Sequence, residues 1–594
     1  MNRIPFIPET APFTAEQRMW LNGFLAGVFS NANPPGASAL ASTLGLDIGP
    51  QTPLVVLYGS QTGTAEGLAK KTAKIAESRG FAPKLVSMEK YADVDLTKEE
   101  NVLVITSTYG EGEPPDMAKG FWDWLKGDSA PKLDHLRYSV LALGDTNYAD
   151  FCQFGKNCDE RLAALGAKRV VERKDCDVDY DAPAGEWTAS VFAALGETFA
   201  HSSNGANGSN GSTASVAETA SGGWSKKNPF PAKLITNRRL SGEGSGKDVR
   251  HFEISLAGSE LTYEVGDALG VFPMNCPQLV GEILAALRCD GEEAVKTADG
   301  EHSLRLALTQ HFDITKPSHE LLSAVVQRSP SAEFAPLLDA LRKDDLKKWL
   351  YGREVIDVLA RLATPFTAQE FVALLKKLAP RLYSISSSLK AHADEVHLTI
   401  AAVRYESHGR SRRGVASTFL ADRVGETGTV PLYVQASHGF KPPVNGDTPM
   451  IMVGPGTGIA PFRAFLEERL ATGAKGPNWL FFGDQKRATD FLYQGQLEGW
   501  VKDGHLTRLD LAFSRDQAEK IYVQSRMIEA SAELWSWLEA GAHFYVCGDA
   551  LRMAKDVDAA LHTVIEKTGG KSSDEAKAYV DRLKSEKRYQ RDVY

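Results

Sequence analysis

Three loops rich in glycine, hydroxyl and aromatic residues each follow a short apolar stretch near the start of the chain. Residues 54–58 lead into GSQTGTAE, residues 102–106 into STYGEGEPP, and residues 139–143 into GDTNYADFC. If the apolar stretches are parallel strands of a doubly wound sheet, these loops meet at the carboxyl edge, where such sheets bind ligands. The first loop opens a helix and contains no lysine, so it suits a single phosphate rather than a triphosphate.

Tyrosines in two of these loops could hold a flat ring between them. A lone tyrosine usually belongs to the core or the surface, but Tyr109 and Tyr148 lie on loops that should converge. The pattern therefore predicts a mononucleotide site with a planar ring. Its predicted residues are Ser60, Gln61, Thr62, Gly63, Thr64, Ala65, Ser107, Thr108, Tyr109, Gly110, Leu143, Gly144, Asp145, Thr146, Asn147, Tyr148, Phe151 and Cys152.

A second set of residues suits a dinucleotide that contains a flavin. The segment RLYSISSS, residues 381–388, places a cation, a ring and a hydroxyl close together. Thirty residues later the small residues of GVAST open what reads as a helix, where a pyrophosphate can approach free backbone N–H groups. Each half alone could be an ordinary turn. Together they predict contacts from Arg381, Leu382, Tyr383, Ser384, Gly414, Val415, Ala416 and Ser417.

A third set follows the apolar stretch 450–453. The sequence GPGTGIAPFRAFLEE is a variant of the dinucleotide fingerprint, and AFSRDQAEKIYVQ downstream supplies two cations, a ring and hydroxyls. Charge-assisted contacts to a 2′-phosphate would favour NADPH over NADH, although a solvated charged loop is the simpler alternative. The predicted NADPH contacts are Gly456, Thr457, Ser514, Arg515, Lys520, Tyr522, Gln524 and Asp556.

These sites need several domains, because 594 residues exceed the length that one core supports. The pattern predicts an N-terminal extension over 1–50 with an amphipathic helix at 14–29, and a mononucleotide domain over 51–200. A Gly/Ser/Asn-rich tether over 201–227 follows, long enough to span about 25–30 Å. A β-rich domain over 228–445 is interrupted by helical periodicity near 276–380, and a nucleotide-binding domain completes the chain over 446–594.

Charge and cysteine usage limit the class of protein. The net charge is −9, and residues 51–200 hold 17 Lys+Arg against 24 Asp+Glu, which argues against nucleic-acid binding. An acidic domain could dock on a basic partner, although solubility alone would also explain it. The 6 cysteines show no CxxC pair, and no apolar run is long enough to span a bilayer. A cytoplasmic protein without a metal site of its own is expected.

The three loops, the RLYSISSS and GVAST segments and the terminal RYQRDVY resemble the diflavin reductases. That resemblance implies a multidomain α/β protein: a flavodoxin-like FMN domain, a flexible linker, an FAD-binding β-barrel with a helical connecting insert, and a Rossmann-like NADPH domain. It also implies that Thr399, Ala401 and Tyr405 line the adenosine of FAD. Ser384, Cys547 and Asp592 would surround the reactive flavin nitrogen, and Tyr594 would stack on the flavin and move aside for nicotinamide.

The resemblance implies electron flow from NADPH to FAD to FMN and then to a haem or iron–sulfur partner. It is closest to the sulfite-reducing branch, whose acceptor is a sirohaem/iron–sulfur haemoprotein that forms sulfide for cysteine biosynthesis. Tyr109 stands where that branch usually has glutamine, which leaves a soluble cytochrome reductase open as an alternative. A non-catalytic NADPH sensor is a third possibility. The amphipathic helix at 14–29 could join subunits, contact the haem partner or pack on its own chain.

Overall fold

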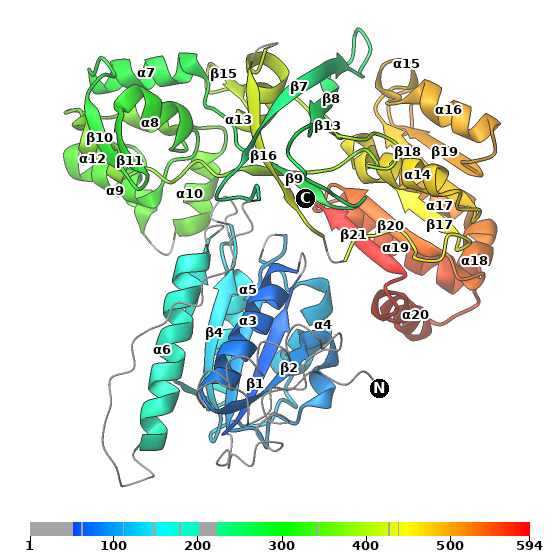
Figure 1. Ribbon diagram of the computed structural model, residues 1–594, viewed down its shortest axis with the longest axis horizontal. Helices are drawn as coiled ribbons and strands as arrows, with labels where there is room; N and C mark the ends of the chain where they lie inside the picture. Colours follow the sequence, from blue (N-terminus) through cyan, green and yellow to red (C-terminus); the bar gives the residue numbers. More distant parts are fainter. Residues whose placement is uncertain are drawn as a thin grey trace, which may run out of the picture.

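The computed structural model describes residues 52–60, 63–110, 112–145, 150–177, 180–200, 223–339, 342–425, 428–437 and 439–594. The predicted helix at 14–29 and most of the predicted tether lie outside these residues. The described chain forms three large sheets, each with its own core, and two two-stranded hairpins; Figure 1 shows the large sheets as separate bodies that meet near the last strand. No helix within these ranges is long and apolar enough to cross a membrane.

The first sheet is parallel, with strand order β2-β1-β3-β4-β5 and β6 paired to β4. Its strands are β1 (Thr52–Gly59), β2 (Phe81–Ser87), β3 (Asn101–Ser107), β4 (Arg137–Leu143), β5 (Lys168–Arg169) and β6 (Lys174–Cys176). Helices α3 (Thr64–Ser78) and α6 (Asp181–Ala200) cover one face, and α4 (Lys119–Lys126) and α5 (Gln153–Ala164) cover the other. Burial on both faces explains why β1, β3 and β4 read as continuous apolar runs.

The second sheet is antiparallel, with strand order β12-β9-β16-β7-β8-β13. Its strands are β7 (Phe230–Arg239), β8 (Val249–Ser255), β9 (Ala268–Val271), β12 (Arg381–Ser384), β13 (Glu395–Ala401) and β16 (Thr429–Gln435). A hairpin of β14 (Arg404–Ser407) and β15 (Arg410–Arg413) leads into the short helix α13 (Val415–Thr418).

A helical insert separates β9 from β12 in the sequence, although the two strands pair directly. It has its own apolar core. Its helices are α7 (Pro277–Leu287), α8 (Leu304–Gln310), α9 (His319–Arg328), α10 (Lys343–Leu350), α11 (Val355–Leu359) and α12 (Ala368–Ala373). Arg412 of β15 is fully buried and joins the insert to the hairpin through Glu354 at 3.0 Å and Asp357 at 2.7 Å.

The third sheet is parallel, with strand order β19-β18-β17-β20-β21. Its strands are β17 (Met450–Val453), β18 (Asn478–Asp484), β19 (Arg508–Phe513), β20 (His543–Gly548) and β21 (Tyr589–Val593). Helices α14 (Ala460–Thr472) and α16 (Gln494–Lys502) cover one face; α17 (Val523–Glu529), α18 (Ser531–Glu539), α19 (Met553–Lys567) and α20 (Ser573–Ser585) cover the other. The multidomain α/β class is as predicted.

Candidate functional site

The predicted mononucleotide site lies at the carboxyl edge of the first sheet. Gly63 precedes helix α3 with φ 90°, a left-handed conformation that glycine adopts without strain, and its N–H donates to Ser60 Oγ at 2.9 Å. The next loop is tied to its neighbour, because Thr108 N–H donates to the Leu143 carbonyl at 2.9 Å and Thr108 Oγ1 accepts from Phe154 N–H at 3.2 Å. The loops therefore converge as the sequence predicted.

Two features of this edge fit a bound mononucleotide. The Ser107 hydroxyl is buried and has no hydrogen-bond partner in the described structure, as expected of a group that awaits a polar ligand atom. At Gly144 a Cβ would lie 2.8 Å from the Cys152 backbone nitrogen, so a side chain would disrupt the loop. Other predicted contacts lie outside the described residues: Gln61, Thr62, Thr146, Asn147 and Tyr148.

The predicted FAD site lies between β12 and α13. Pairing with β9 places Arg381 opposite Val271 and Ser384 opposite Ala268. Leu382 is 52% exposed, although its neighbours in the strand are partly buried. A ring that stacks on this strand would cover that apolar side chain, so its exposure fits the proposed flavin position.

Arg423 stabilises the turn at α13. Its guanidinium donates to the Val415 carbonyl at 2.8 Å and to Thr418 Oγ1 at 2.7 Å. The Ser417 hydroxyl accepts from Val403 N–H at 3.1 Å, and a Cβ at Gly414 would meet that hydroxyl at 2.7 Å. The small residues of GVAST thus let the loop close tightly, which is what a pyrophosphate cradle needs.

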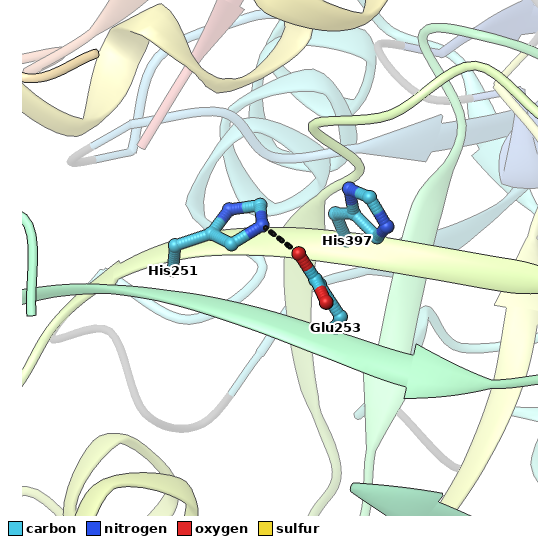
Figure 2. Close-up of side chains that lie close together, drawn as sticks. All are labelled: His251, Glu253 and His397. Carbon is cyan, nitrogen blue, oxygen red and sulfur yellow. Dashed lines mark hydrogen bonds and ion pairs between the residues drawn. The ribbon is translucent and has the colours of Figure 1, made fainter. Parts of the chain in front are cut away.

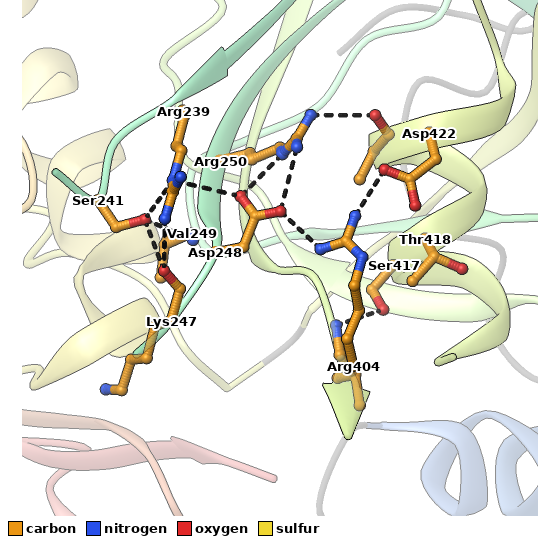
Figure 3. A network of polar contacts seen from close by, with 12 residues as sticks. Arg239, Ser241, Lys247, Asp248, Val249, Arg250, Arg404, Ser417, Thr418 and Asp422 are labelled. Atoms are coloured by element: carbon orange, nitrogen blue, oxygen red, sulfur yellow. Dashed lines mark hydrogen bonds and ion pairs between the residues drawn. The ribbon is translucent and has the colours of Figure 1, made fainter. Parts of the chain in front are cut away.

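Figure 3 shows the polar network beside this turn. The Asp248 carboxylate accepts from Arg250 at 2.9 Å and from Arg404 at 2.6 Å, and Arg404 also contacts Asp422 at 2.5 Å. These contacts fix the start of β14, whose Tyr405 is 48% exposed. An anchored, exposed tyrosine is suited to the predicted contact with adenosine.

Two other predicted adenosine contacts are less accessible. The Thr399 hydroxyl is buried and lies 2.6 Å from the Tyr493 hydroxyl, and Ala401 is partly buried at the end of β13. The structure therefore directs Thr399 toward the third domain. Its contact with adenosine stays a prediction.

The glycine turn after β17 is required by close packing. A Cβ at Gly458 would lie 2.2 Å from the Cys547 carbonyl oxygen, and a Cβ at Gly454 would lie 2.5 Å from the Gly458 carbonyl oxygen. Gly456 has φ 58°, in the left-handed region. The backbone can approach a pyrophosphate here only because these positions carry no side chain.

The cations predicted to bind the 2′-phosphate follow β19. Arg515, Lys520 and Tyr522 are exposed, and neither cation has an ion pair with any described residue. Gln524 Nε2 donates to Asp556 Oδ2 at 3.2 Å, so the structure brings these two predicted contacts together. Ser514 directly follows β19, and its N–H donates to the carbonyl of Asp484 at the end of β18 at 2.9 Å. The unpaired cations fit an anionic ligand.

Lys247 and Asp484 also belong to this edge, but sequence reasoning missed them. Lys247 comes from the second domain, and its Nζ lies 2.5 Å from Asp484 Oδ1. The other oxygen of Asp484 is buried and has no hydrogen-bond partner among the described residues, and burial raises the pKa of this carboxyl. Both groups lie beside Gly456. Asp484 at the end of an apolar stretch was a usable signal, whereas Lys247 in a polar loop offered none.

The predicted reactive groups come together from three strands. Ser384 Oγ donates to Asp592 Oδ2 at 2.5 Å, and Cys547 Sγ lies 3.9 Å from the same oxygen. Pairing of β20 with β21 places Cys547 directly opposite Asp592. Burial raises the pKa of both Cys547 and Asp592, and the bond from Ser384 opposes the shift of Asp592. The thiol therefore stays protonated.

Tyr594 lies at the same site, beside the glycine turn that follows β17. Its hydroxyl lies 3.1 Å from Thr457 Oγ1, and its N–H donates to the Gly548 carbonyl at 3.0 Å. The residue is 58% exposed. A large exposed ring beside Asp592 and Thr457 can cover a flat ligand and can also be displaced.

Figure 2 shows His251, Glu253 and His397 of the second sheet, whose buried imidazoles also contact residues of the third domain. His251 contacts Glu253 at 3.1 Å and the Tyr493 hydroxyl at 2.9 Å; His397 contacts Glu395 at 3.0 Å and Arg463 at 3.4 Å. All four ring nitrogens thus have protein partners. The nearby Arg463 guanidinium disfavours a bound metal ion. The cluster therefore serves as a contact between the second and third domains.

Burial lowers the pKa of His251, and burial with the nearby Arg463 lowers that of His397 from 6.5 to about 3. Both rings are neutral in the folded state, whereas the unfolded chain binds protons below about pH 6.5. The stability from these rings is therefore present above pH 6.5 and is lost as the pH falls toward 3. We expect the shifted pKa of His397 alone to lower the free energy of unfolding by about 2 kcal/mol between pH 7 and pH 5. Chemical denaturation at both pH values measures this loss of unfolding free energy. The loss should be smaller in His397→Gln than in wild type, and it should equal the wild-type loss in the exposed control His319→Gln.

Comparisons with known proteins place the chain in a class. It matches the Flavodoxin family over residues 56–187, the FAD binding domain over 223–419 and the Oxidoreductase NAD-binding domain over 452–559. Together with the three converging sites, these matches define a flavoprotein oxidoreductase with FMN-, FAD- and nicotinamide-binding domains.

Several relatives match along nearly the whole chain. The sulfite reductase [NADPH] flavoprotein alpha-component of Bacillus subtilis is 47% identical over 98% of this chain and 96% of the relative. The proteins of the same name from Photobacterium profundum and Vibrio cholerae are 43% identical over 99% and 96%, and 45% identical over 98% and 93%, of the two chains. The chain belongs to the family of sulfite reductase [NADPH] flavoprotein alpha-components.

Proposed function

We propose that the chain accepts hydride from NADPH at FAD and passes electrons through FMN to a haemoprotein that reduces sulfite to sulfide. The carrying observation is the position of β21. Asp592 contacts Ser384 on the FAD-binding sheet, and the Val593 carbonyl accepts from the Tyr109 hydroxyl of the mononucleotide site at 3.4 Å. One short strand thus adjoins both flavin sites, as direct electron transfer between them requires.

The proposal assigns each cofactor to a set of residues. Ser60, Gly63 and Thr64 would receive the FMN phosphate, and Arg381 with Gly414–Ser417 the phosphates of FAD. When bound, the flavins supply the conversion of a two-electron hydride donor into single-electron steps. Asp592, with its raised pKa, can hold or release a proton at its Oδ2 atom toward Ser384 Oγ. Arg515 and Lys520 would orient the coenzyme through its 2′-phosphate.

The partner follows from the charge of the first domain and from the names of the relatives. An alpha-component implies a second component, and the acidic first domain suits a basic docking surface. The test supplies NADPH, sulfite and a purified sirohaem/iron–sulfur protein and measures sulfide. Sulfide formation that needs both proteins supports the proposal. Reduction of cytochrome c without sulfide formation would favour a cytochrome reductase, and no reduction of either cytochrome c or ferricyanide would favour an NADPH sensor.

Removal of residues 1–50 is expected to leave NADPH–cytochrome c reduction intact and to change the elution volume on gel filtration. The reason is the apolar face predicted for 14–29, which needs a partner surface on another subunit, on the haem partner or on its own chain. If the elution volume does not change, the helix packs on its own chain. Loss of cytochrome c reduction would show that this segment supports the flavin domains.

A further inference from the structure

Strand β21 makes contacts with different domains at alternating positions. Asp592 reaches Ser384, and the Tyr594 hydroxyl reaches Thr457. Arg591 instead reaches Asp116 of the first domain, with Nε 3.0 Å from Oδ2 and Nη2 on the other carboxylate oxygen. Since successive side chains of a strand point to opposite faces, one face of β21 meets the flavin and nicotinamide sites and the other meets the FMN domain.

The Arg591–Asp116 contact is well defined. Both oxygens of the carboxylate are engaged, and the two side chains are only 11% and 22% exposed. Burial alone would raise the pKa of Asp116, but Arg591 and Lys119 hold it well below its usual range, so the carboxylate is charged. Partial burial limits screening by salt, so this pair outweighs the exposed pair of Lys555 and Glu113 at 3.5 Å.

We propose that Arg591 is a positioning residue that couples docking of the FMN domain to the covering position of Tyr594. The inference rests on the proposed function, because it assigns Tyr594 to the site that nicotinamide must enter. Only Asp592 separates Arg591 from Val593, whose carbonyl accepts from the Tyr109 hydroxyl, and Tyr594 comes next in the sequence. While the FMN domain is docked, the end of β21 is held from both faces and Tyr594 stays in place.

The coupling has a definite sign. Nicotinamide and the Tyr594 ring compete for one stacking position, so a tie that holds the ring weakens coenzyme binding. By linkage, bound coenzyme must weaken docking of the FMN domain by the same factor. Loading the coenzyme thus releases the domain that carries electrons outward, and redocking restores the cover.

The sharpest test uses Asp116→Asn in the full chain with both flavins bound. Asp116 lies on the FMN domain and contacts β21 through Arg591, away from the predicted coenzyme contacts, so a direct effect on coenzyme binding is not expected. NADP⁺ should bind about fivefold more tightly, at the lower end of typical coupling between sites. Titration calorimetry measures the affinity, and small-angle scattering should show a larger radius of gyration. The control, Arg361→Ala, removes an exposed ion pair with Glu333 in the helical insert and should change neither quantity.

A double-mutant cycle separates coupling from an unrelated effect on stability. In the Tyr594→Ala background, Asp116→Asn should still expand the molecule but should no longer change the NADP⁺ affinity, because the covering ring is absent. An effect of Asp116→Asn that persists without Tyr594 would overturn the proposal. If Asp116→Asn expands the molecule without changing the NADP⁺ affinity while Tyr594 is present, the proposal is also overturned.

A second variant covers the case in which Asp116→Asn loses FMN or fails to fold. Arg591→Lys keeps the charge but loses the two-point contact with Asp116. We expect this variant to tighten NADP⁺ binding by a smaller factor than Asp116→Asn does. No change in that variant would also overturn the inference. These measurements need no electron acceptor, so they do not depend on whether the acceptor is assigned correctly. They can also fail when the reaction with the acceptor is intact, so the two proposals fail separately.

Discussion

Replacing both Arg515 and Lys520 by alanine is expected to weaken NADPH binding by at least about tenfold and to leave NADH binding nearly unchanged. Both side chains are exposed on the segment after β19 without an ion pair in the described structure. Each charge-assisted contact to phosphate contributes about 1.5–3 kcal/mol, and NADH offers no 2′-phosphate to lose. The measurement is the Kd of each coenzyme for wild type and variant.

The matched control removes two exposed lysines from the same domain. Lys475 and Lys502 lie away from the segment that carries the predicted contacts, so Lys475→Ala with Lys502→Ala changes the net charge equally. If the control loses as much NADPH affinity as the test variant, the effect is one of general charge. If the ratio of NADPH to NADH affinity stays as in wild type, the 2′-phosphate assignment is wrong.

Replacing Tyr594 by alanine is expected to raise kcat/KM for NADH relative to NADPH by about two- to tenfold. Aromatic stacking contributes about 0.5–1.5 kcal/mol beyond area burial, so the ring biases occupancy yet can be displaced. NADH lacks the 2′-phosphate contacts that help NADPH displace the ring, and it therefore gains more when the ring is removed. Oxidised coenzyme should also leave more slowly.

Flavin content is the internal control for this variant. The FAD phosphates are assigned to Arg381 and Gly414–Ser417, and the FMN phosphate to the loop around Gly63, so both flavins should remain at wild-type stoichiometry. Tyr594→Phe keeps the ring and loses only the 3.1 Å contact with Thr457, so it should behave like wild type. If Tyr594→Ala leaves the NADH to NADPH ratio unchanged, Tyr594 is not the gate.

The parts of the fold that could be predicted are those in which local pattern and burial agree. Strands β1, β3 and β4 are buried on both faces, so each is a continuous apolar run followed by a glycine-rich loop, and the edge that binds ligand followed from them. The glycines after β17 were identified for the same reason: their sequence spacing reflects packing against Cys547.

Contacts between distant segments could not be predicted. Strand β21 reads as a polar tail, because its partners are a single neighbouring strand and two other domains. Nothing local to Arg591 indicates Asp116, which lies 475 residues earlier. Lys247 is similar, since its loop carries no periodicity and its partner Asp484 belongs to another domain. Thr399 shows the opposite case. The resemblance assigns its hydroxyl to the adenosine of FAD, and in the structure this hydroxyl contacts the Tyr493 hydroxyl.

The pairing of β9 with β12 has a consequence for how this part of the chain tolerates change in length. Adjacent strands lie about 4.7–4.9 Å apart, so the helical insert leaves the second sheet and returns to it at neighbouring points. Because its core is separate, residues can be gained or lost within the insert without moving either strand. The exception is α11, where Asp357 and the N-cap residue Glu354 hold the buried Arg412, which lies two residues before Gly414. Length variation should therefore accumulate elsewhere in the insert, and a shift of α11 should be felt at the turn assigned to the FAD pyrophosphate.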